Sequence, residues 1–155
     1  MRTLILVSLL SATSIGVAMT DPLAHMDPRG VVSIIVDQAA TVGVDYREAM
    51  RLAYAGNQRA LADLFRVTLV SDGGGATLHS GYLKILLSRF GDGRYSTILS
   101  RQRAKVRKSV IDAIDFAFRD QQWATDFPLT YRIAPHDPYW PERANQAMRS
   151  TAGRR

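Results

Sequence analysis

The apolar residues of the stretch 78–118 recur every three or four positions, the spacing that lines one side of an α-helix. In its first part the recurring residues are Leu78, Tyr82, Ile85, Leu86 and Phe90. In its second part they are Tyr95, Ile98, Leu99, Val106, Val110, Ala113, Ile114 and Ala117. The turn sequence Gly91-Asp92-Gly93 separates the two parts. Because two amphipathic helices hide their apolar sides most easily against each other, the pattern predicts a helical hairpin.

The pattern leaves open whether the second arm, 94–118, is one helix or a bent pair. Six of its apolar residues, spread from Tyr95 to Ala117, fall within about 60° of one another on a helical wheel, which favours one continuous helix. Gln102 and Arg103 interrupt the apolar stripe in the middle of the arm, which favours a bend.

A further helix is predicted at 30–43, after the helix-start signal Asp27-Pro28. This segment is ambiguous, because the β-branched residues between 31 and 36 favour a strand whereas Ala39-Ala40 favours a helix. We interpret it as a helix because the chain offers no second strong strand to pair with it.

Two more helices are expected before the hairpin. Asp45, followed three residues later by Glu48, forms a capping box that starts the first of them, and Gly56 suits its end. Asn57 then starts the second. The inner side of this second helix should hold Leu61, Leu64, Phe65 and Leu69.

The glycine run at 73–75 predicts a break, since each glycine disfavours helix by about 1 kcal/mol. A phosphate-binding loop would require a Gly-Lys-Ser/Thr ending, whereas Ala76-Thr77-Leu78 follows here. We therefore expect a linker at 71–75, with Thr77 capping the first arm of the hairpin.

Prolines alternate with aromatic residues near the C-terminus, namely Phe127, Pro128, Tyr131, Pro135, Pro138, Tyr139, Trp140 and Pro141. Prolines at this density prevent a long helix, and aromatic side chains carry too much apolar area to stay in water. We expect 127–155 to form an extended strap that packs on a helical domain at 19–126. The predicted fold is all-α, with about five to six helices.

The N-terminus has the three parts of a secretory signal peptide. Met1-Arg2 supplies a positive start, 4–10 an apolar run, and Gly16-Val17-Ala18 a small-residue cleavage site. We expect the signal peptide 1–18 to be cleaved near Ala18, giving a secreted or periplasmic protein without a transmembrane helix. The alternative is that the segment stays attached as an N-terminal anchor.

The chain has no cysteine and only three histidines. The absence of cysteine excludes disulfides, thiolate zinc sites, cysteine nucleophiles and lipid attachment at the cleavage site. His25, His79 and His136 lack ligand partners at the spacings that a metal site uses. We therefore expect no metal and no cofactor.

No catalytic signature stands out, and no G-x-S-x-G motif is present. Asp112 and Asp115 lie one helical turn apart, as paired catalytic acids can, but a salt bridge between Asp112 and Lys108 is the preferred interpretation. An alternative function is a small extracytoplasmic hydrolase that uses His136 and Asp137 in a groove under the strap. It requires a second acid, base or nucleophile within hydrogen-bond reach of His136.

The net charge of +6 is unevenly distributed. Twelve basic and six acidic residues lie in 93–155, against seven and eight in 19–92. The densest cluster comprises Arg101, Arg103, Lys105, Arg107 and Lys108. Such a cluster can bind an acidic protein, an anionic envelope polymer or lipid headgroups, or can simply be a solvated helix face. Nucleic acid is disfavoured because no stacking aromatic residues interleave the cations.

The sequence from Tyr95 to Ile114 resembles a HEAT-type repeat, a pair of antiparallel helices in an α-solenoid. The second helix of that family usually begins with a Val-Arg pair, here Val106-Arg107, followed by Val110 and then Ala113-Ile114. Gly56-Asn57 and Gly91-Asp92 lie 35 residues apart, a spacing within the range of helical repeats. The resemblance implies a binding scaffold without chemistry of its own, with Arg107 in a structural salt bridge. We therefore expect a non-enzymatic binding or adaptor module with no catalytic residues.

Overall fold

The computed structural model describes residues 31–118 and 123–136, which form eight helices and no β-strand. Six helices make up the body: α1 (Val31–Ala40), α2 (Tyr46–Tyr54), α3 (Gln58–Val67), α4 (Gly73–Phe90), α5 (Asp92–Ser100) and α6 (Ala104–Phe118). Two one-turn helices follow: α7 (Trp123–Asp126) and α8 (Pro128–Tyr131). The predicted all-α fold with five to six helices is therefore confirmed.

The signal peptide expected at 1–18, His25, Asp137 and the strap beyond position 136 lie outside the described residues. Those expectations stay predictions. In the part of the chain that is described, no helix combines the length and apolar character needed to cross a membrane.

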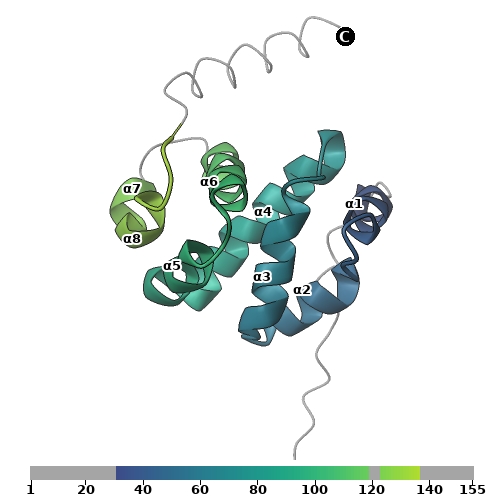
Figure 1. The fold of residues 1–155 in the computed structure, drawn as a ribbon, viewed down its shortest axis with the longest axis horizontal. Coiled ribbons are helices and arrows are strands. Elements are labelled where there is room, and N and C mark those ends of the chain that lie inside the picture. The colour runs from purple at the N-terminus through teal and green to yellow at the C-terminus, as the bar shows by residue number, and fades with distance from the viewer. Residues whose placement is uncertain (1–30, 119–122, 137–155) are drawn as a thin grey trace, which may run out of the picture.

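Helix α4 is the element around which the others pack. Figure 1 shows it running through the middle of the molecule, with α6 on one side and α1 on the other. Leu83, Leu86 and Leu87 of α4 are completely buried, and Tyr82 and Phe90 are nearly so. A helix with apolar residues on more than one side has to be covered on more than one side. The neighbours of α4 supply that cover.

Helix α1 confirms the helical interpretation of 30–43. Val32, Ile35 and Ala39 recur at helical spacing and are buried, whereas Ile34 is 45% exposed. β-branched residues lose only a few tenths of a kcal/mol as helix formers, so burial of one face decides the outcome.

The predicted starts of α2 and α3 are also confirmed. The side chain of Asp45 accepts a hydrogen bond from the Glu48 backbone N–H at 3.1 Å, and that of Asn57 accepts one from the Ala60 N–H at 3.0 Å. The Glu48 carboxylate pairs with Arg51 instead of reaching back to Asp45, so only half of the capping box forms.

The predicted inner side of α3 is right for its first three members and wrong for the last. Leu61, Leu64 and Phe65 are completely buried. Helix α3 ends at Val67, however, and Leu69 falls in the following turn with 39% of its surface exposed.

The prediction that the glycine run is a linker is wrong, because α4 begins at Gly73 and Thr77 lies inside it. The reason is tertiary packing. A Cβ atom on Gly75 would lie only 2.5 Å from Oε1 of Gln38, so the missing side chain lets α1 approach α4 closely. The Gln38 amide also hydrogen-bonds the carboxylate of Asp72, the residue just before α4.

The second arm of the hairpin is a bent pair. Helix α5 ends at Ser100 and α6 begins at Ala104. Gln102 fixes the bend: its N–H donates to the Leu99 carbonyl at 2.9 Å, and its own carbonyl accepts from the Arg107 guanidinium at 2.6 Å. The turn between the two arms is shorter than predicted, because Gly91 alone, with φ of +74°, separates α4 from α5.

The described part of the predicted strap is folded rather than extended. Pro128 starts helix α8, where its missing N–H costs nothing. The two carboxylate oxygens of Asp92 accept hydrogen bonds from the backbone N–H groups of Leu129 and Thr130, both at 2.8 Å. These bonds attach α8 to the start of α5.

His79 lies inside α4 and in the core, with 1% of its surface exposed. One ring nitrogen, Nε2, is 3.1 Å from the Leu64 carbonyl oxygen, and the other, Nδ1, is 2.9 Å from the Tyr46 hydroxyl. Because a carbonyl can only accept, Nε2 carries the proton and Nδ1 accepts from Tyr46. Burial lowers the pKa of His79 from 6.5 to about 4, so the ring is neutral in the folded protein.

The buried imidazole predicts a loss of stability in mild acid. The folded-state pKa of His79 is below its unfolded value, so the unfolded chain binds the extra proton first. The contribution of neutral His79 to the free energy of unfolding is fully present above about pH 6.5. It is lost as the pH drops towards 4, by on the order of 3 kcal/mol in total. Urea unfolding of the wild type and His79→Gln across this range measures the effect.

His79→Gln should lose this part of the pH dependence, because its amide can still donate to Leu64 but does not titrate. Tyr46→Phe is the matched control. It removes the hydroxyl that donates to His79 but leaves the imidazole of His79 in the core to titrate. Equal slopes of unfolding free energy against pH in the wild type and His79→Gln would contradict the prediction.

Candidate functional site

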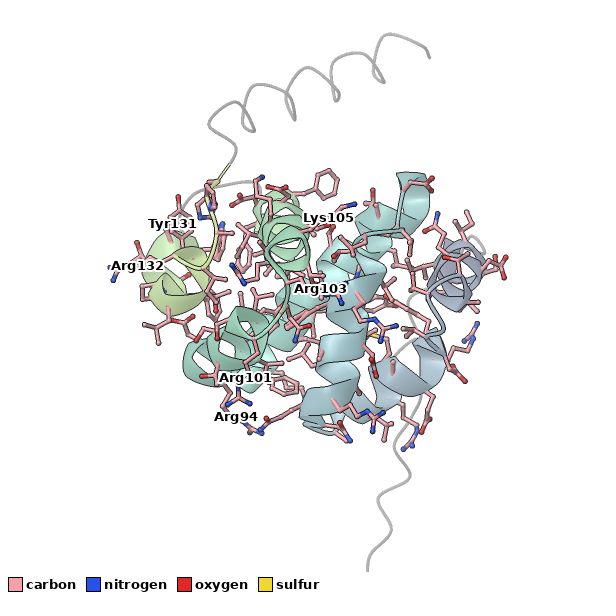
Figure 2. The ribbon with its side chains drawn as sticks, viewed as in Figure 1. Arg94, Arg101, Arg103, Lys105, Tyr131 and Arg132 are labelled. Atoms are coloured by element: carbon pink, nitrogen blue, oxygen red, sulfur yellow. The ribbon has the colours of Figure 1, made fainter. Side chains whose placement is uncertain are left out.

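Exposed cations lie along the bend between α5 and α6. Arg101 follows the last residue of α5, Arg103 precedes α6, and Lys105 lies in the first turn of α6. All three side chains are exposed. Figure 2 shows Arg94, Arg101, Arg103 and Lys105 one after another along α5, the bend and the start of α6. We refer to these four residues as the basic ridge.

The structure divides the predicted cluster into two groups. The side chains of Arg101, Arg103 and Lys105 form no ion pair or hydrogen bond with any described residue. Arg107 and Lys108 already have partners: Arg107 donates to the Gln102 carbonyl, and Lys108 pairs with the Asp112 carboxylate at 2.5 Å. Only the first group is available to a partner.

Arg107 makes a different contact from the one that the repeat resemblance implied. It donates to a backbone carbonyl across the bend, and no described carboxylate pairs with it. Its role within the described structure is therefore to hold α5 and α6 at their bend.

Arg94 belongs to the ridge but was missed from the sequence. It is exposed, and its guanidinium lies 5.5 Å from the centre of the Phe90 ring. Arg94 and Arg101 are seven residues apart, which places them on the same side of α5. The seven-residue spacing could have identified Arg94 from the sequence, but Arg94 lies outside the dense run of cations at 101–108.

The ridge concentrates positive charge where a helix already has its positive end. The first turn of α6 contains no acidic residue. Arg103, immediately before that turn, has no acceptor in its side chain and cannot cap the helix. Each cation at the positive end of a helix costs on the order of 0.3–1 kcal/mol at low salt, and a bound anion would remove that cost.

The described residues offer no alternative metal centre. Within them, no three His, Asp or Glu side chains lie close enough together to hold a metal ion. Of the two histidines in this part of the chain, His79 is enclosed in the core and His136 lies beside α6.

Asp115 of α6 organises the second cluster of polar side chains. Its Oδ1 accepts from the indole N–H of Trp123 at 2.9 Å, and its Oδ2 lies 2.8 Å from Nδ1 of His136. The other ring nitrogen of His136 is 2.7 Å from the Tyr131 carbonyl oxygen, and the Tyr131 ring stacks on the imidazole. Trp123 itself is 1% exposed. The cluster joins α7, α8 and the segment after them to α6.

This geometry bears on the hydrolase alternative in two ways. Asp115 supplies the second titratable group within hydrogen-bond reach of His136 that the alternative required. Both ring nitrogens are engaged, however: Nε2 must donate to the Tyr131 carbonyl, and one proton lies between Nδ1 and Asp115. Neither nitrogen is left to take a proton from a water or a hydroxyl group.

The two acids that the sequence placed one turn apart have separate partners. Asp112 pairs with Lys108, as preferred, and both side chains are more than 40% exposed. Asp115 accepts a hydrogen bond from Trp123 and contacts His136, and only 12% of its side chain is exposed. The Asp115–His136 contact spans 21 residues, so neighbouring residues gave no signal for it.

Comparison with protein-family models, with curated proteins and with solved structures finds no match for this chain.

Asp115→Asn should loosen the attachment of α7 and α8. The amide keeps one acceptor but loses the charge, so a largely buried charge-assisted hydrogen bond is lost. We expect the free energy of unfolding to fall by about 1–3 kcal/mol. Urea unfolding followed by tryptophan fluorescence measures the change.

Asp112→Asn is the matched control on the same helix. Its pair with Lys108 is exposed, so the variant should change stability by less than about 1 kcal/mol. If both variants were equally neutral, the Asp115 cluster would not be what holds α7 and α8 in place.

Proposed function

We propose that the protein is a non-enzymatic binding module that holds an anionic macromolecule, an acidic protein or an anionic envelope polymer, on the basic ridge. The observation that carries this proposal is the row of exposed Arg101, Arg103 and Lys105 side chains, which have no counter-charge among the described residues. Cations that stabilise a fold have partners, as Arg51, Arg66 and Lys108 do here.

Several features of the ridge suit it to binding. Arginine presents a planar fork of donors that matches carboxylate and phosphate groups, and Arg101 and Arg103 lie close together in the chain. Hydrogen bonds to Gln102 hold the bend between the two helices. A partner therefore meets charges whose backbone positions are already fixed, which reduces the entropy lost on binding.

The scaffold interpretation is part of the same proposal. The HEAT-type resemblance places a turn in this part of the chain, where α5 ends at Ser100 and α6 begins at Ala104, but α5 packs mainly on α8 and α6 mainly on α4. Val106, Val110 and Ile114, the apolar positions of that resemblance, are buried. A secreted or periplasmic location, with the signal peptide removed near Ala18, would place the ridge among envelope polymers and extracytoplasmic proteins.

Reversing two charges of the ridge tests the proposal. Arg101→Glu with Lys105→Glu should weaken binding to poly-L-glutamate, used as a simple polyanion, by about tenfold or more. Wild-type binding should weaken steeply as salt is raised, because exposed charges are screened. Fluorescence anisotropy of labelled polyanion over a salt series measures both effects.

Arg59→Glu with Arg132→Glu is the control, because it changes the net charge equally at two other exposed positions. It should reduce affinity by much less than the ridge variant. Equal losses in the two double variants would mean that net charge, not the ridge, attracts the polyanion. Salt-insensitive binding would remove the proposal altogether.

A further inference from the structure

An open groove of about 290 Å³ lies between α6 and the first half of α4, beside the end of α3. Ala76, Thr77 and Ser80 of α4 form one wall, and Ala113 and Phe116 of α6 form the other. The residues of α4 that line the groove have small side chains, and these leave the space between α4 and α6.

The polar groups that line the groove already have partners within the protein, so they do not require a polar ligand. The hydroxyls of Ser80, Thr77 and Thr68 donate to nearby backbone carbonyls at 2.7, 3.2 and 2.6 Å, and that of Ser71 lies 3.5 Å from the Thr68 carbonyl oxygen. The remaining carboxylate, Asp112, pairs with Lys108. An apolar side chain could enter without leaving any of these groups unsatisfied.

The size of the groove indicates what can enter it. Pockets for small-molecule ligands usually hold about 300–1,000 Å³, and this groove lies just below that range. It suits one or two apolar side chains of a larger partner, packed against Ala76, Ala113 and Phe116.

The groove and the basic ridge are neighbours on α6. The Lys108 ammonium lies at the edge of the groove, on Asp112, and Lys105 is one turn before Lys108. Ser109 donates to the Thr68 carbonyl at 3.0 Å, which joins α6 to the end of α3 where the groove begins. Apolar and cationic recognition elements therefore follow one another along a single helix.

We propose that the groove and the ridge form one docking surface for a helical or extended segment of an acidic protein. Apolar side chains of that segment occupy the groove, and its carboxylates lie on Lys105, Arg103 and Arg101. The inference rests on the proposed function and names its partner class. A sugar or phosphate polymer would fill the ridge but has no apolar side chain for the groove, and charge complementarity selects an acidic segment over a basic one.

The test uses a fluorescein-labelled peptide of about 14 residues, roughly four helical turns, with leucine at every third or fourth position and glutamate at the others. A peptide with lysine in place of glutamate is the matched control. The acidic peptide should bind saturably with a dissociation constant below about 1 mM, and the lysine peptide should not. Amide NMR shifts should change at Thr77 and Phe116 as well as at Lys105.

Thr77→Trp fills the groove from an exposed position, so it should leave the fold intact and weaken peptide binding by about tenfold or more. Ala76→Leu fills it from the same wall and serves as a second variant. Gln58→Trp is the control, an equally large addition at an exposed position of α3, and should change the affinity by less than about twofold.

The outcomes separate the two proposals. If the ridge variant weakens peptide binding and Thr77→Trp does not, the groove inference is overturned and the proposed function stands. If Thr77→Trp weakens it and the ridge variant does not, the proposed function falls, and with it the joint surface. Equal binding of the lysine peptide, or no saturation by about 1 mM, overturns the inference. So does binding to phosphatidylglycerol vesicles that Thr77→Trp abolishes, because the occupant would then be lipid.

Discussion

The burial of α4 between α1 and α6 is the constraint on which the described structure depends. The chain has no cysteine to cross-link it, so the free energy of folding has to come from packing. On the α1 side Gly75 is buried against the Gln38 side chain, and Leu83, Leu86 and Leu87 are completely buried. Everything on the α6 side, including the ridge and the groove, takes its position from this packing.

The row of exposed cations arises from the way the second arm of the hairpin is divided into α5 and α6. On a single straight helix Arg103 would lie on the opposite side from Arg101 and Lys105, since residues two positions apart differ by about 200°. The bend at Gln102 removes them from one helical register: Arg101 and Arg103 lie between the end of α5 and the start of α6, and Lys105 lies in the first turn of α6. Arg103 and Lys105 lie at the positive end of α6, so the backbone adds to the positive charge of these side chains.

Features that depend on neighbouring residues could be predicted from the sequence. Helix starts at Asp45 and Asn57 followed from local capping chemistry, and the Lys108–Asp112 pair followed from helical spacing. The cations of the ridge were identified, apart from Arg94. Which of them remain without partners could not be predicted, because that depends on the bend and on the Gln102 carbonyl taking Arg107.

The wrong predictions share a cause. Local propensity argued against helix at Gly73 to Gly75, but α4 begins there, with Gly75 packed against Gln38 of α1. Local composition argued for an extended segment after Phe127, but Asp92 and Asp115 bind that segment from α5 and α6. In each case a residue more than 20 positions away decided the outcome, and no pattern of period two or 3.6 records such a partner.

The two hydrogen bonds from α8 to Asp92 also link the C-terminal end of the described fold mechanically to the bend between α5 and α6. They close the chain between positions 92 and 130 into a ring that contains both arms of the bend and, at its far side, the Asp115 cluster. Opening the angle at Gln102 would stretch that ring and pull directly on α8. Force applied to the cations at the bend is therefore shared with the C-terminal end of the described fold.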